Sequence, residues 1–432
     1  MTTSTVVLTG AACGIGRAAA RRFAADGWRC VLLDRNRDAL SEVVAGLPAV
    51  AGGDHEGRCI DLSDGEQIRS LASIATPISA IVNNAGMSDP SGVPLVEQTP
   101  EQQATLLALN LLGPDAMVSA LAPRLAPNAR VVNVASGAGL RAIPFRGLYS
   151  PTKAGLIAQS LAMARSRPEL MVTVLCPGFV RTKLVDRLIA AGRLDPIAAV
   201  AKTPLGRLAE PVEMAEALVF LASPAAEAIR GQVVSLCGGS SVYGGSRACE
   251  PAVEATLPLD APLAATVIAD ARGFAREVER QLSRAEGNGA AYPAVIDGTA
   301  LTVEPGASTT VMASVHEAAR RFVARHSKTA SLTLLLAVSA EGSRDAAPGS
   351  ATEGTAGTGA AVASDDWRRA GARAAARMLV STLACELAPR GLRVNAVEVA
   401  AGTEPARVAG LLDYLAGARG QYLTGQTLRV VA

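Results

Sequence analysis

Short apolar runs alternate with alanine-rich amphipathic stretches over residues 5–239. Five of these runs, VVLTG, CVLLD, AIVNNAG, ARVVNVAS and MVTVLCPG, end in small or polar residues, as buried strands do where they enter loops. Strands that alternate with helices over this length predict an α/β architecture built on a doubly wound parallel sheet. Because ligands bind beyond the carboxyl ends of such strands, we expect functional side chains at the ends of these runs.

The pattern changes after residue 239. Residues 240–262 are rich in Gly, Ser and Pro, which predicts a linker. The chain then resembles its own first part at a constant offset of 194, at which Glu210–Pro211 matches Glu404–Pro405 without a gap. We therefore predict a first domain over residues 1–239, a linker, and a truncated second domain over residues 263–432 that is a degenerate copy of the first.

A glycine-rich turn follows the first apolar run. The sequence TGAACGIG stands directly before the helical stretch RAAARRFAADG, so its glycines allow a tight turn and the helix N-terminus offers amides to a pyrophosphate. Asp34 ends the second run, where a carboxylate accepts hydrogen bonds from the ribose hydroxyls of a dinucleotide. The candidate cofactor residues in this region are Gly10, Cys13, Gly14, Ile15, Gly16 and Asp34.

Asp34 also bears on which dinucleotide binds. A carboxylate repels the extra phosphate of NADP, so the sequence favours NAD. Arg35 and Arg37 leave NADP open, because either guanidinium can hold that phosphate, although both also suit the solvated start of a helix.

Ser136, Tyr149 and Lys153 form the strongest catalytic pattern. Ser136 ends the run ARVVNVAS, and Tyr149 and Lys153 in YSPTK lie four residues apart, on one face of a predicted helix. The neighbouring ammonium favours the phenolate of a tyrosine whose ordinary pKa is about 10, so Tyr149 suits a general acid or base. Ser136 would hydrogen-bond the same substrate oxygen while hydride moves to or from a nicotinamide.

Together these motifs resemble the short-chain dehydrogenase/reductase family, in its compact cofactor-first form, over essentially all of residues 5–239. The resemblance implies a Rossmann fold, hydride transfer without a metal, and a proton-relay water held by Asn110 near Lys153. It also implies that Lys153 binds the nicotinamide ribose. Further cofactor residues implied by the resemblance are Asp61, Leu62, Asn84, Ala85 and Gly86 on the adenosine side, and Pro177, Gly178, Val180 and Thr182 beside the nicotinamide carboxamide.

Residues 183–208 occupy the position of the family's substrate-covering helices, so substrate specificity is expected there. Arg141, Arg146 and Lys183 lie in or beside loops expected near the site, and they are candidate contacts to an anionic substrate. Exposed charges on mobile loops explain the same pattern, and the sequence does not separate the two interpretations.

The second copy lacks the catalytic pattern. Counting back from Asn395 by the family's spacing puts Arg369 and Arg373 at the positions of the catalytic tyrosine and lysine, and a guanidinium does not give up its proton at neutral pH. Ser339 matches the catalytic serine, but no glycine-rich turn precedes it. We therefore predict that the second domain stands in for a partner subunit, and that two chains form a homodimer equivalent to a tetramer.

Composition narrows the classes of function. The 41 Lys and Arg nearly balance the 39 Asp and Glu, so no basic field for nucleic acid is expected. No stretch reaches the roughly 18 uninterrupted apolar residues of a membrane span, and MTTSTVVLTG lacks the charged start and apolar core of a secretory signal, which favours a cytoplasmic protein. The seven cysteines include no CxxC pair, so neither a disulfide framework nor a metal site is expected.

The sequence favours an NAD-dependent dehydrogenase that oxidises a secondary alcohol to a ketone, with Tyr149 as general base. One alternative is an NADPH-dependent ketoreductase similar to ketoacyl reductases, and another is a dinucleotide-sensing or scaffolding protein without catalysis. The intact set Asn110, Ser136, Tyr149 and Lys153 favours an enzyme that acts on a small alcohol or ketone.

Overall fold

The computed structural model describes residues 3–430 except for residues 52, 90, 193, 246, 253–255, 283–290, 303–307 and 339–365. The chain divides into two compact units. The first comprises Met1–Val253 and the short segment Arg419–Thr424, and the second comprises Glu254–Ala418 and Gly425–Ala432. The main division lies within the segment 240–262 that the sequence predicts as a linker, but the first unit also includes a segment from near the end of the chain.

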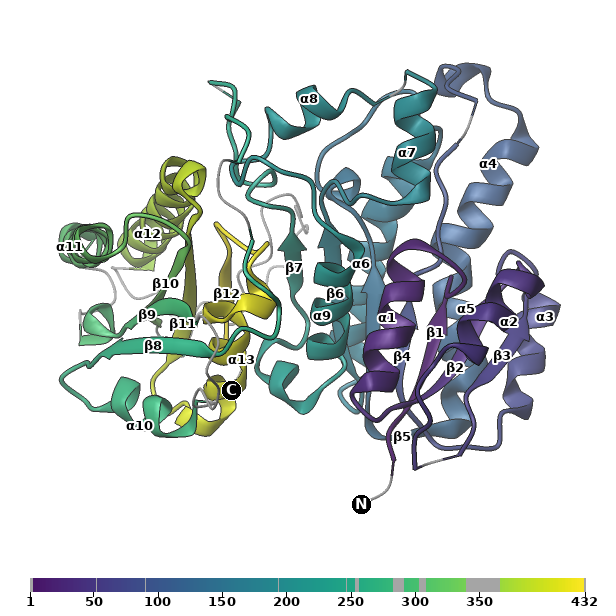
Figure 1. Ribbon diagram of the computed structural model, residues 1–432, viewed down its shortest axis with the longest axis horizontal. Coiled ribbons are helices and arrows are strands. Elements are labelled where there is room, and N and C mark those ends of the chain that lie inside the picture. The colour runs from purple at the N-terminus through teal and green to yellow at the C-terminus, as the bar shows by residue number, and fades with distance from the viewer. Residues whose placement is uncertain are drawn as a thin grey trace, which may run out of the picture. The chain divides into compact units, whose positions relative to one another are not determined.

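A seven-stranded sheet forms the middle of the first unit (Figure 1). Its strand order is β3-β2-β1-β4-β5-β6-β7, and every neighbouring pair is parallel. The predicted doubly wound parallel sheet is therefore confirmed. The strands are β1 (Thr5–Thr9), β2 (Arg29–Asp34), β3 (Glu56–Cys59), β4 (Ile78–Asn83), β5 (Leu125–Val134), β6 (Met171–Pro177) and β7 (Val233–Leu236).

Two of these strands, β3 and β7, are not among the five apolar runs that the sequence picks out. They are the two edge strands of the sheet. β3 has the sequence EGRC, and its side chains are at most partly buried, so it carries no apolar run. β7 has only four residues, which is too short for a distinct pattern.

Helices cover both faces of this sheet (Figure 1). α1 packs against α9 on one face, and α3 packs against α5 on the other. Such crossover helices are required because parallel strands cannot be joined by tight turns. The helices are α1 (Gly14–Ala25), α2 (Arg37–Ala45), α3 (Gly65–Ser70), α4 (Pro100–Leu107), α5 (Gly113–Leu121), α6 (Tyr149–Ser166), α7 (Lys183–Ala190), α8 (Pro196–Val200) and α9 (Pro211–Leu221).

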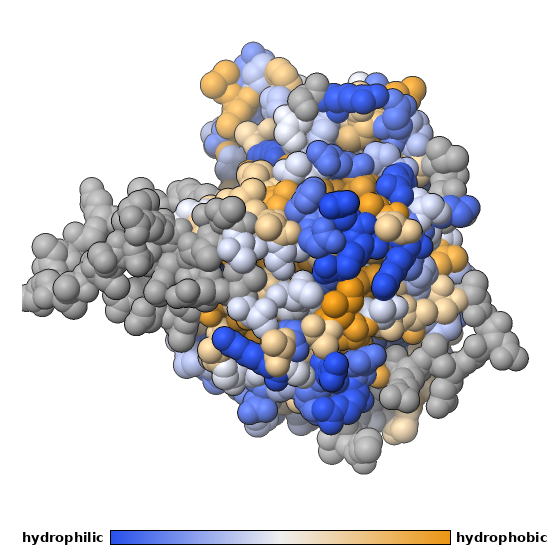
Figure 2. Space-filling model, turned by 90° about the vertical axis from the view of Figure 1, so that its left-hand side faces the viewer, coloured by the Kyte–Doolittle hydropathy of each residue, from blue (hydrophilic) through white to orange (hydrophobic). Residues whose placement is uncertain are grey.

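One helical run of the first unit, Pro100–Arg124, is long and apolar enough to span a membrane by length and composition alone. It contains α4, the π-helix Ala108–Leu112 and α5. Polar residues such as Asn110 interrupt it, and Leu106 and Leu121 are buried inside the unit. Leu107 and Leu112 of the same run are 38% and 54% exposed. Exposed apolar patches alternate with hydrophilic clusters on the face of the molecule that Figure 2 shows.

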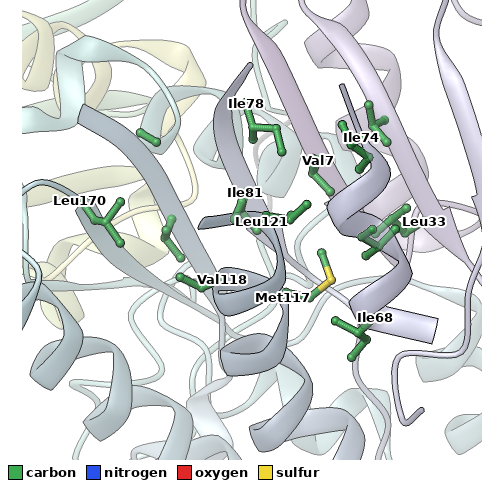
Figure 3. Close-up of a cluster of buried hydrophobic side chains, with 14 of the residues drawn as sticks. Val7, Leu33, Ile68, Ile74, Ile78, Ile81, Met117, Val118, Leu121 and Leu170 are labelled. Atoms are coloured by element: carbon green, nitrogen blue, oxygen red, sulfur yellow. The ribbon is translucent and has the colours of Figure 1, made fainter. Parts of the chain in front are cut away.

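The core of the first unit lies between the sheet and helices α3 and α5 (Figure 3). Val7 and Ile81 come from neighbouring strands and join Met117 and Leu121 of α5, and all four side chains are at most 1% exposed. Burial of each such side chain stabilises the fold by about 1.5–3 kcal/mol. This packing holds the carboxyl ends of the strands, from which the candidate site residues project.

The second unit contains a five-stranded sheet of order β12-β11-β10-β9-β8, parallel throughout. A truncated Rossmann-like second domain is thus confirmed as a smaller parallel sheet. Its core includes Phe322 of α11 and Val380 of α12. The elements are β8 (Leu263–Ile268), α10 (Phe274–Gln281), β9 (Tyr292–Asp297), α11 (Ser308–Arg325), β10 (Ala330–Val338), α12 (Asp366–Leu387), β11 (Leu392–Ala400), α13 (Pro405–Ala416) and β12 (Thr427–Arg429).

The two sheets share a neighbour order. β8, β9, β10, β11 and β12 follow one another as β1, β4, β5, β6 and β7 do, and counterparts of β2 and β3 are absent from the described part of the second unit. Equivalent backbone hydrogen bonds support this correspondence, with acceptors 194 positions apart and donors 222 positions apart. The N–H of Val174 donates to the carbonyl of Gln232 at 3.0 Å, and the N–H of Ala396 donates to that of Gln426 at 2.8 Å.

Burial along α12 follows the spacing found along α6. The buried residues that correspond are Ala372, Ala376, Val380 and Ala384 on α12 and Thr152, Leu156, Ser160 and Ala164 on α6. This alignment puts Arg373 at the position of Lys153 and Arg369 at that of Tyr149, in agreement with the count from the sequence.

The counterpart of Ser136 differs from the sequence alignment. Ser339 lies outside the described residues, and because β10 pairs with β11 in the register of β5 with β6, Ala337 takes the position of Ser136. The turn between β8 and α10, residues 269–273, takes the position of the glycine-rich turn. Sequence comparison misses it because the described second unit has no counterparts of β2 and β3, and because Gly273 is the only glycine of the turn.

Candidate active site

A cleft of about 330 Å³ opens at the carboxyl ends of β1, β2 and β4 in the first unit. Most of the predicted cofactor residues line it, namely Gly10, Cys13, Gly14, Ile15, Asp34, Asp61, Leu62, Asn84, Ala85, Gly86 and Thr182. Five others, Gly16, Lys153, Pro177, Gly178 and Val180, do not form its wall. The cleft thus combines a glycine-rich turn with two carboxylates at successive strand ends.

The glycine-rich turn requires glycine for two separate reasons. Gly10 and Gly14 have φ values of +67° and +53°, in the left-handed region that favours glycine. At Gly16 the reason is space, because a Cβ there would lie 2.0 Å from the carbonyl oxygen of Gly10. Gly16 therefore acts by letting α1 approach the turn closely, which brings the helix N-terminus to the cleft.

Two carboxylates on the cleft wall are held by backbone amides. Asp34 accepts the N–H of Ala12 at Oδ2 (3.0 Å) and the N–H of Asn36 at Oδ1 (2.9 Å), so it joins the end of β2 to the glycine-rich turn. Asp61 accepts hydrogen bonds from the hydroxyl (2.6 Å) and N–H (2.8 Å) of Ser63, which lower the pKa of its carboxyl. The Asp61 side chain is therefore ionised at neutral pH.

Asn110 lies in the middle of the π-helix between α4 and α5 and is fully buried. Its Oδ1 accepts the N–H of Met87 at 3.0 Å, and its Nδ2 donates to the carbonyl of Met87 at 2.8 Å and to the hydroxyl of Thr152 at 3.2 Å. Asn110 therefore ties the loop after β4 to the first turns of α6. A π-helical turn inside a longer helix is frequent at functional sites.

Ser136, Tyr149 and Lys153 come together beside this loop. Ser136 follows β5, and its hydroxyl hydrogen-bonds the phenol of Tyr149 at the start of α6. Lys153, one turn further along α6, is 4% exposed, and its Nζ lies 6.0 Å from the centroid of the Tyr149 ring. The same Nζ donates to the carbonyl of Val134 at 2.8 Å. A Cβ at Gly86 would lie 3.1 Å from this Nζ, so the ammonium reaches the cleft wall.

Burial shifts the pKa values of both titrating groups toward their neutral forms. It raises the pKa of the Tyr149 phenol, while the hydrogen bond from Ser136 acts in the opposite direction. It lowers the pKa of the Lys153 ammonium to about 8. Lys153 is therefore mostly charged at neutral pH but loses its proton far more readily than a lysine in water.

Of the residues predicted beside the nicotinamide, Thr182 lines the cleft, and Pro177, Gly178 and Val180 do not. A Cβ at Gly178 would lie 2.8 Å from the Cα of Cys237, so glycine lets the end of β6 approach the loop after β7. Val180 forms a bridge with Ala209, and the hydroxyl of Thr182 accepts the N–H of Val185 at the start of α7. Pro177 ends β6 itself.

The predicted substrate cations lie in different surroundings. The Arg141 guanidinium donates to the carbonyls of Ser240, Ser241 and Tyr243, so it holds the loop after β7. The carbonyl of Arg146 accepts the N–H of Tyr149 at 3.2 Å. Lys183 begins α7 and lines the cleft. Of the three, Lys183 is the one that stands on the cleft wall.

Some lining residues carry no signal in the sequence. Met87, Thr105 and Leu109 line the cleft, the last two from α4 and the π-helix. Their residue types are ordinary for a helix and a loop, so only the packing of these elements identifies them. Arg35, considered above as a phosphate contact, also lines the cleft. Among the described residues, no group of three His, Cys, Asp or Glu is placed to hold a metal ion.

Known proteins resemble the part of the chain that carries this site. The family model described as enoyl-(acyl carrier protein) reductase matches residues 10–241. The uncharacterized short-chain type dehydrogenase/reductase y4vI of Sinorhizobium fredii is 38% identical over 240 residues, 54% of this chain and 43% of that protein. The chain thus spans less than half of y4vI.

Two further relatives are covered almost completely. The 3-oxoacyl-(acyl-carrier-protein) reductase FabG of Thermotoga maritima is 30% identical over 244 residues, 54% of this chain and 96% of FabG. The crystal structure of an actinorhodin polyketide ketoreductase with NADPH is 27% identical, with a TM-score of 0.50 over 56% of this chain and 100% of that one. With the glycine-rich cleft and the Ser136, Tyr149 and Lys153 constellation, these matches show that the chain belongs to the short-chain dehydrogenase/reductase family and is an NAD(P)-dependent oxidoreductase acting on CH–OH groups.

Proposed function

We propose that the protein is an NAD-dependent dehydrogenase that interconverts a secondary alcohol and the corresponding ketone. One observation carries the proposal. The phenol of Tyr149, hydrogen-bonded to Ser136 and close to the ammonium of Lys153, stands beside a cleft whose glycine-rich turn and strand-end carboxylate suit a dinucleotide.

The residues of the cleft fit a nicotinamide dinucleotide. Gly16 has space only for a hydrogen, which brings the amides at the start of α1 within reach of a pyrophosphate. Asp34 lines the cleft at the end of β2, where its carboxylate would accept hydrogen bonds from ribose hydroxyls and would repel a phosphate, which supports NAD. When bound, the nicotinamide would accept or deliver the hydride.

The chain's own residues would handle the proton. Ser136 orients the substrate oxygen with its hydroxyl, and Tyr149 takes the alcohol proton during oxidation or returns it during reduction. Burial raises the pKa of the Tyr149 phenol, and the hydrogen bond from Ser136 and the charge of Arg146 act in the opposite direction. The Lys153 ammonium, 6.0 Å from the centroid of the Tyr149 ring, would also favour the phenolate form. Asn110 hydrogen-bonds Met87 in the loop after β4 and Thr152 in α6. These bonds would fix the position of Tyr149 relative to the cleft wall.

Two observations favour a second candidate function, the NADPH-dependent reduction of a ketoacyl group. Arg35 lines the cleft next to Asp34, so its guanidinium is available to a 2′-phosphate. FabG by its name reduces a 3-oxoacyl carrier protein, and the actinorhodin ketoreductase is described with NADPH. The two candidates share their catalytic residues and differ in cofactor and direction.

For the substrate we propose that Lys183 is the cation to test. It lines the cleft at the first turn of α7, where a charged ammonium can pair with an acidic group of the substrate. Arg141 is the matched comparison, because its guanidinium is already bound to three backbone carbonyls. Lys183→Gln should raise KM for an anionic substrate more than Arg141→Gln does.

We also propose that residues 263–432 are a degenerate duplicate that stands in for a partner subunit, and that two chains form a cytoplasmic homodimer. The shared strand order supports the duplication. The loss of the lysine and tyrosine at Arg373 and Arg369 supports a non-catalytic role.

Leu107 and Leu112, which are 38% and 54% exposed, offer apolar area to a second chain. Light scattering on the purified chain measures the oligomer, and a monomer would contradict the dimer.

Calorimetric titration of the full-length protein with NADH and with NADPH tests the cofactor. We expect one NADH site per chain and an NADPH affinity at least about tenfold weaker, a difference of about 1.4 kcal/mol. Asp34→Ser should weaken NADH and strengthen NADPH, whereas Asp54→Ser, an exposed position outside the cleft, should change neither. Tighter NADPH binding by the unmodified protein would favour the ketoacyl reductase.

Turnover with panels of secondary alcohols and ketones tests the reaction. Tyr149→Phe should lower kcat by about 10²–10⁴-fold while leaving the NADH affinity nearly unchanged, because the hydroxyl is needed for proton transfer only. A Tyr149→Phe protein with normal turnover would exclude Tyr149 as the acid/base. Tight NADH binding without turnover of any substrate would favour a sensor or scaffold.

A further inference from the structure

The second unit contains a cavity that the proposed dehydrogenase does not use. Its volume is about 730 Å³, and it lies at the carboxyl ends of β8, β10 and β11. Leu301, Val338 and Val399 contribute buried apolar side chains, and Phe274 adds an aromatic ring. A cavity of this size at this edge of a parallel sheet has the dimensions and position of a small-molecule site.

The cavity stands at the counterpart of the cofactor cleft. The registers between neighbouring strands align β8 with β1 residue by residue. Continuing this alignment past the ends of the two strands puts Gly273 at the position of Gly14. Both have a left-handed backbone, with φ of +79° and +53°, and both stand at the start of the first helix after the first strand. In the same register Arg272 takes the position of Cys13.

Three differences exclude a dinucleotide from this cavity. The carboxylate of Asp270 accepts the N–H of Ala275 at 2.8 Å and that of Arg272 at 3.0 Å, so a negative charge already occupies the start of α10. Ala275 replaces the glycine that allows the close approach at Gly16. β8 is an edge strand, and the described second unit has no strand that could carry a counterpart of Asp34.

The remaining charges favour an anion smaller than a dinucleotide. Arg280 pairs with Glu277, whose carboxylate lies 2.5 Å from the guanidinium. Asp270 is 6% exposed and is hydrogen-bonded by the two amides, so it is not available as a counter-charge. The guanidinium of Arg272 is exposed and forms no ion pair with any other described residue. It is therefore the cation with unused hydrogen-bonding capacity on the cavity wall.

We propose that this cavity binds a small organic anion, with its acidic group held by Arg272 and its apolar body against Phe274 and Val338. A carboxylate, sulfonate or phosphate monoester on a hydrocarbon or aromatic body has this chemistry. The cavity walls supply the apolar contact area, and the guanidinium supplies two parallel donors to the acidic group. The proposal does not depend on the activity of the first unit.

Binding of 8-anilinonaphthalene-1-sulfonate to the full-length protein tests the proposal, because this dye joins a sulfonate to an apolar ring system. Its fluorescence is titrated with excess NAD⁺ present, which does not fluoresce and occupies the cleft of the first unit if that cleft binds the cofactor. Arg272→Gln should weaken dye binding about tenfold, and Arg272→Lys should recover part of the loss. Ala400→Trp, which adds a large side chain to the cavity wall, should remove this binding.

Arg35→Gln is the matched control, because Arg35 is an exposed arginine on the wall of the other cleft. Arg35→Gln should leave the dye affinity of the cavity in the second unit unchanged, whether or not the first unit binds the cofactor. The uncharged analogue N-phenyl-1-naphthylamine should bind the Arg272→Gln variant as well as the unmodified protein. Dye affinity that is the same in the unmodified protein and in Arg272→Gln overturns the proposal. An equal loss for the charged and uncharged dyes also overturns it. If Ala400→Trp fails to fold, the Arg272 variants decide the question alone.

Discussion

Replacing Lys153 with methionine should change how the stability of the cofactor-free protein depends on pH. Lys153 is 4% exposed, and burial lowers the pKa of its ammonium from the ordinary 10.5 to about 8. Methionine has a similar length and carries no charge, so the variant keeps most of the packing and loses the titration. The pH dependence of the difference between the two proteins therefore isolates the cost of burying the charge.

The sign follows from the protons bound in each state. Between pH 8 and 10.5 the unfolded chain keeps its Lys153 proton while the folded chain has lost it, so raising the pH favours the folded state. A pKa lowered by about 2.5 corresponds to about 3 kcal/mol over the whole window, and about 2 kcal/mol of that falls between pH 7.5 and 10. The unmodified protein should gain this much stability relative to Lys153→Met as the pH rises.

Urea unfolding followed by tryptophan fluorescence measures this difference. The chain has two tryptophans, Trp28 in the first unit and Trp367 in the second. Trp28 is 9% exposed, so a Trp367→Phe background makes the signal report on the first unit alone. Unfolding free energies of both proteins would be taken at several pH values from 7.5 to 10 without cofactor.

Lys202→Met is the control, because Lys202 is exposed and should give a stability difference that does not change with pH. Packing changes caused by methionine alter the unfolding free energy of Lys153→Met by the same amount at every pH, so they do not alter its pH dependence. A flat difference for Lys153→Met across this range would refute the argument. It would mean that the hydrogen bond to Val134 compensates fully for burial and leaves Lys153 as basic as a surface lysine.

Three further predictions concern the support of the site. Gly16→Ala should weaken NADH binding at least about tenfold, because its Cβ would displace the turn carbonyl, whereas Gly65→Ala should leave the affinity unchanged in the same calorimetric assay. Asn110→Ala should lower the unfolding free energy by about 2–4 kcal/mol in urea melts and should also reduce kcat. The reason is that the substitution removes the hydrogen bonds to the backbone of Met87 and to the hydroxyl of Thr152. Normal stability would contradict this prediction. Tyr422→Phe should lower the unfolding free energy by about 1 kcal/mol, because it removes the hydrogen bond to the Arg207 carbonyl. Tyr422→Ala should lower it by about 3–5 kcal/mol, because it also removes the buried ring. Equal stabilities for these two variants would contradict the role of the ring.

Local patterns in the sequence predict the fold of the first unit well. Apolar runs locate five of its seven strands, and the missing two are edge strands without a distinct apolar run. Tyr149 and Lys153 share a helix face because they are four residues apart, which depends only on helix geometry. The glycine-rich turn is predictable for the same reason, since its function resides in a contiguous stretch.

The use of individual polar side chains is different, because each partner comes from a distant part of the chain. Arg141 was a candidate substrate contact, yet its guanidinium is bound to carbonyls about 100 positions away. Asn110 joins Met87 to Thr152, a role that no periodicity encodes. Tyr422 belongs to the first unit although it lies near the end of the chain. Such contacts depend on how the packed elements bring distant backbone atoms together.

The sequence by itself determined the parallel sheet, the glycine-rich turn and the placement of Tyr149 and Lys153 on one helix face, because periodicity and short-range spacing are enough to specify each. Only the tertiary structure decided that residues 269–273 stand at the place of that turn in the second unit and that Asp270 occupies its helix start. It alone showed the cavity beside Arg272. The physical reason is that sheet register and hydrogen-bond partnership are set by contacts between distant segments, which leave no periodic trace in the order of residues.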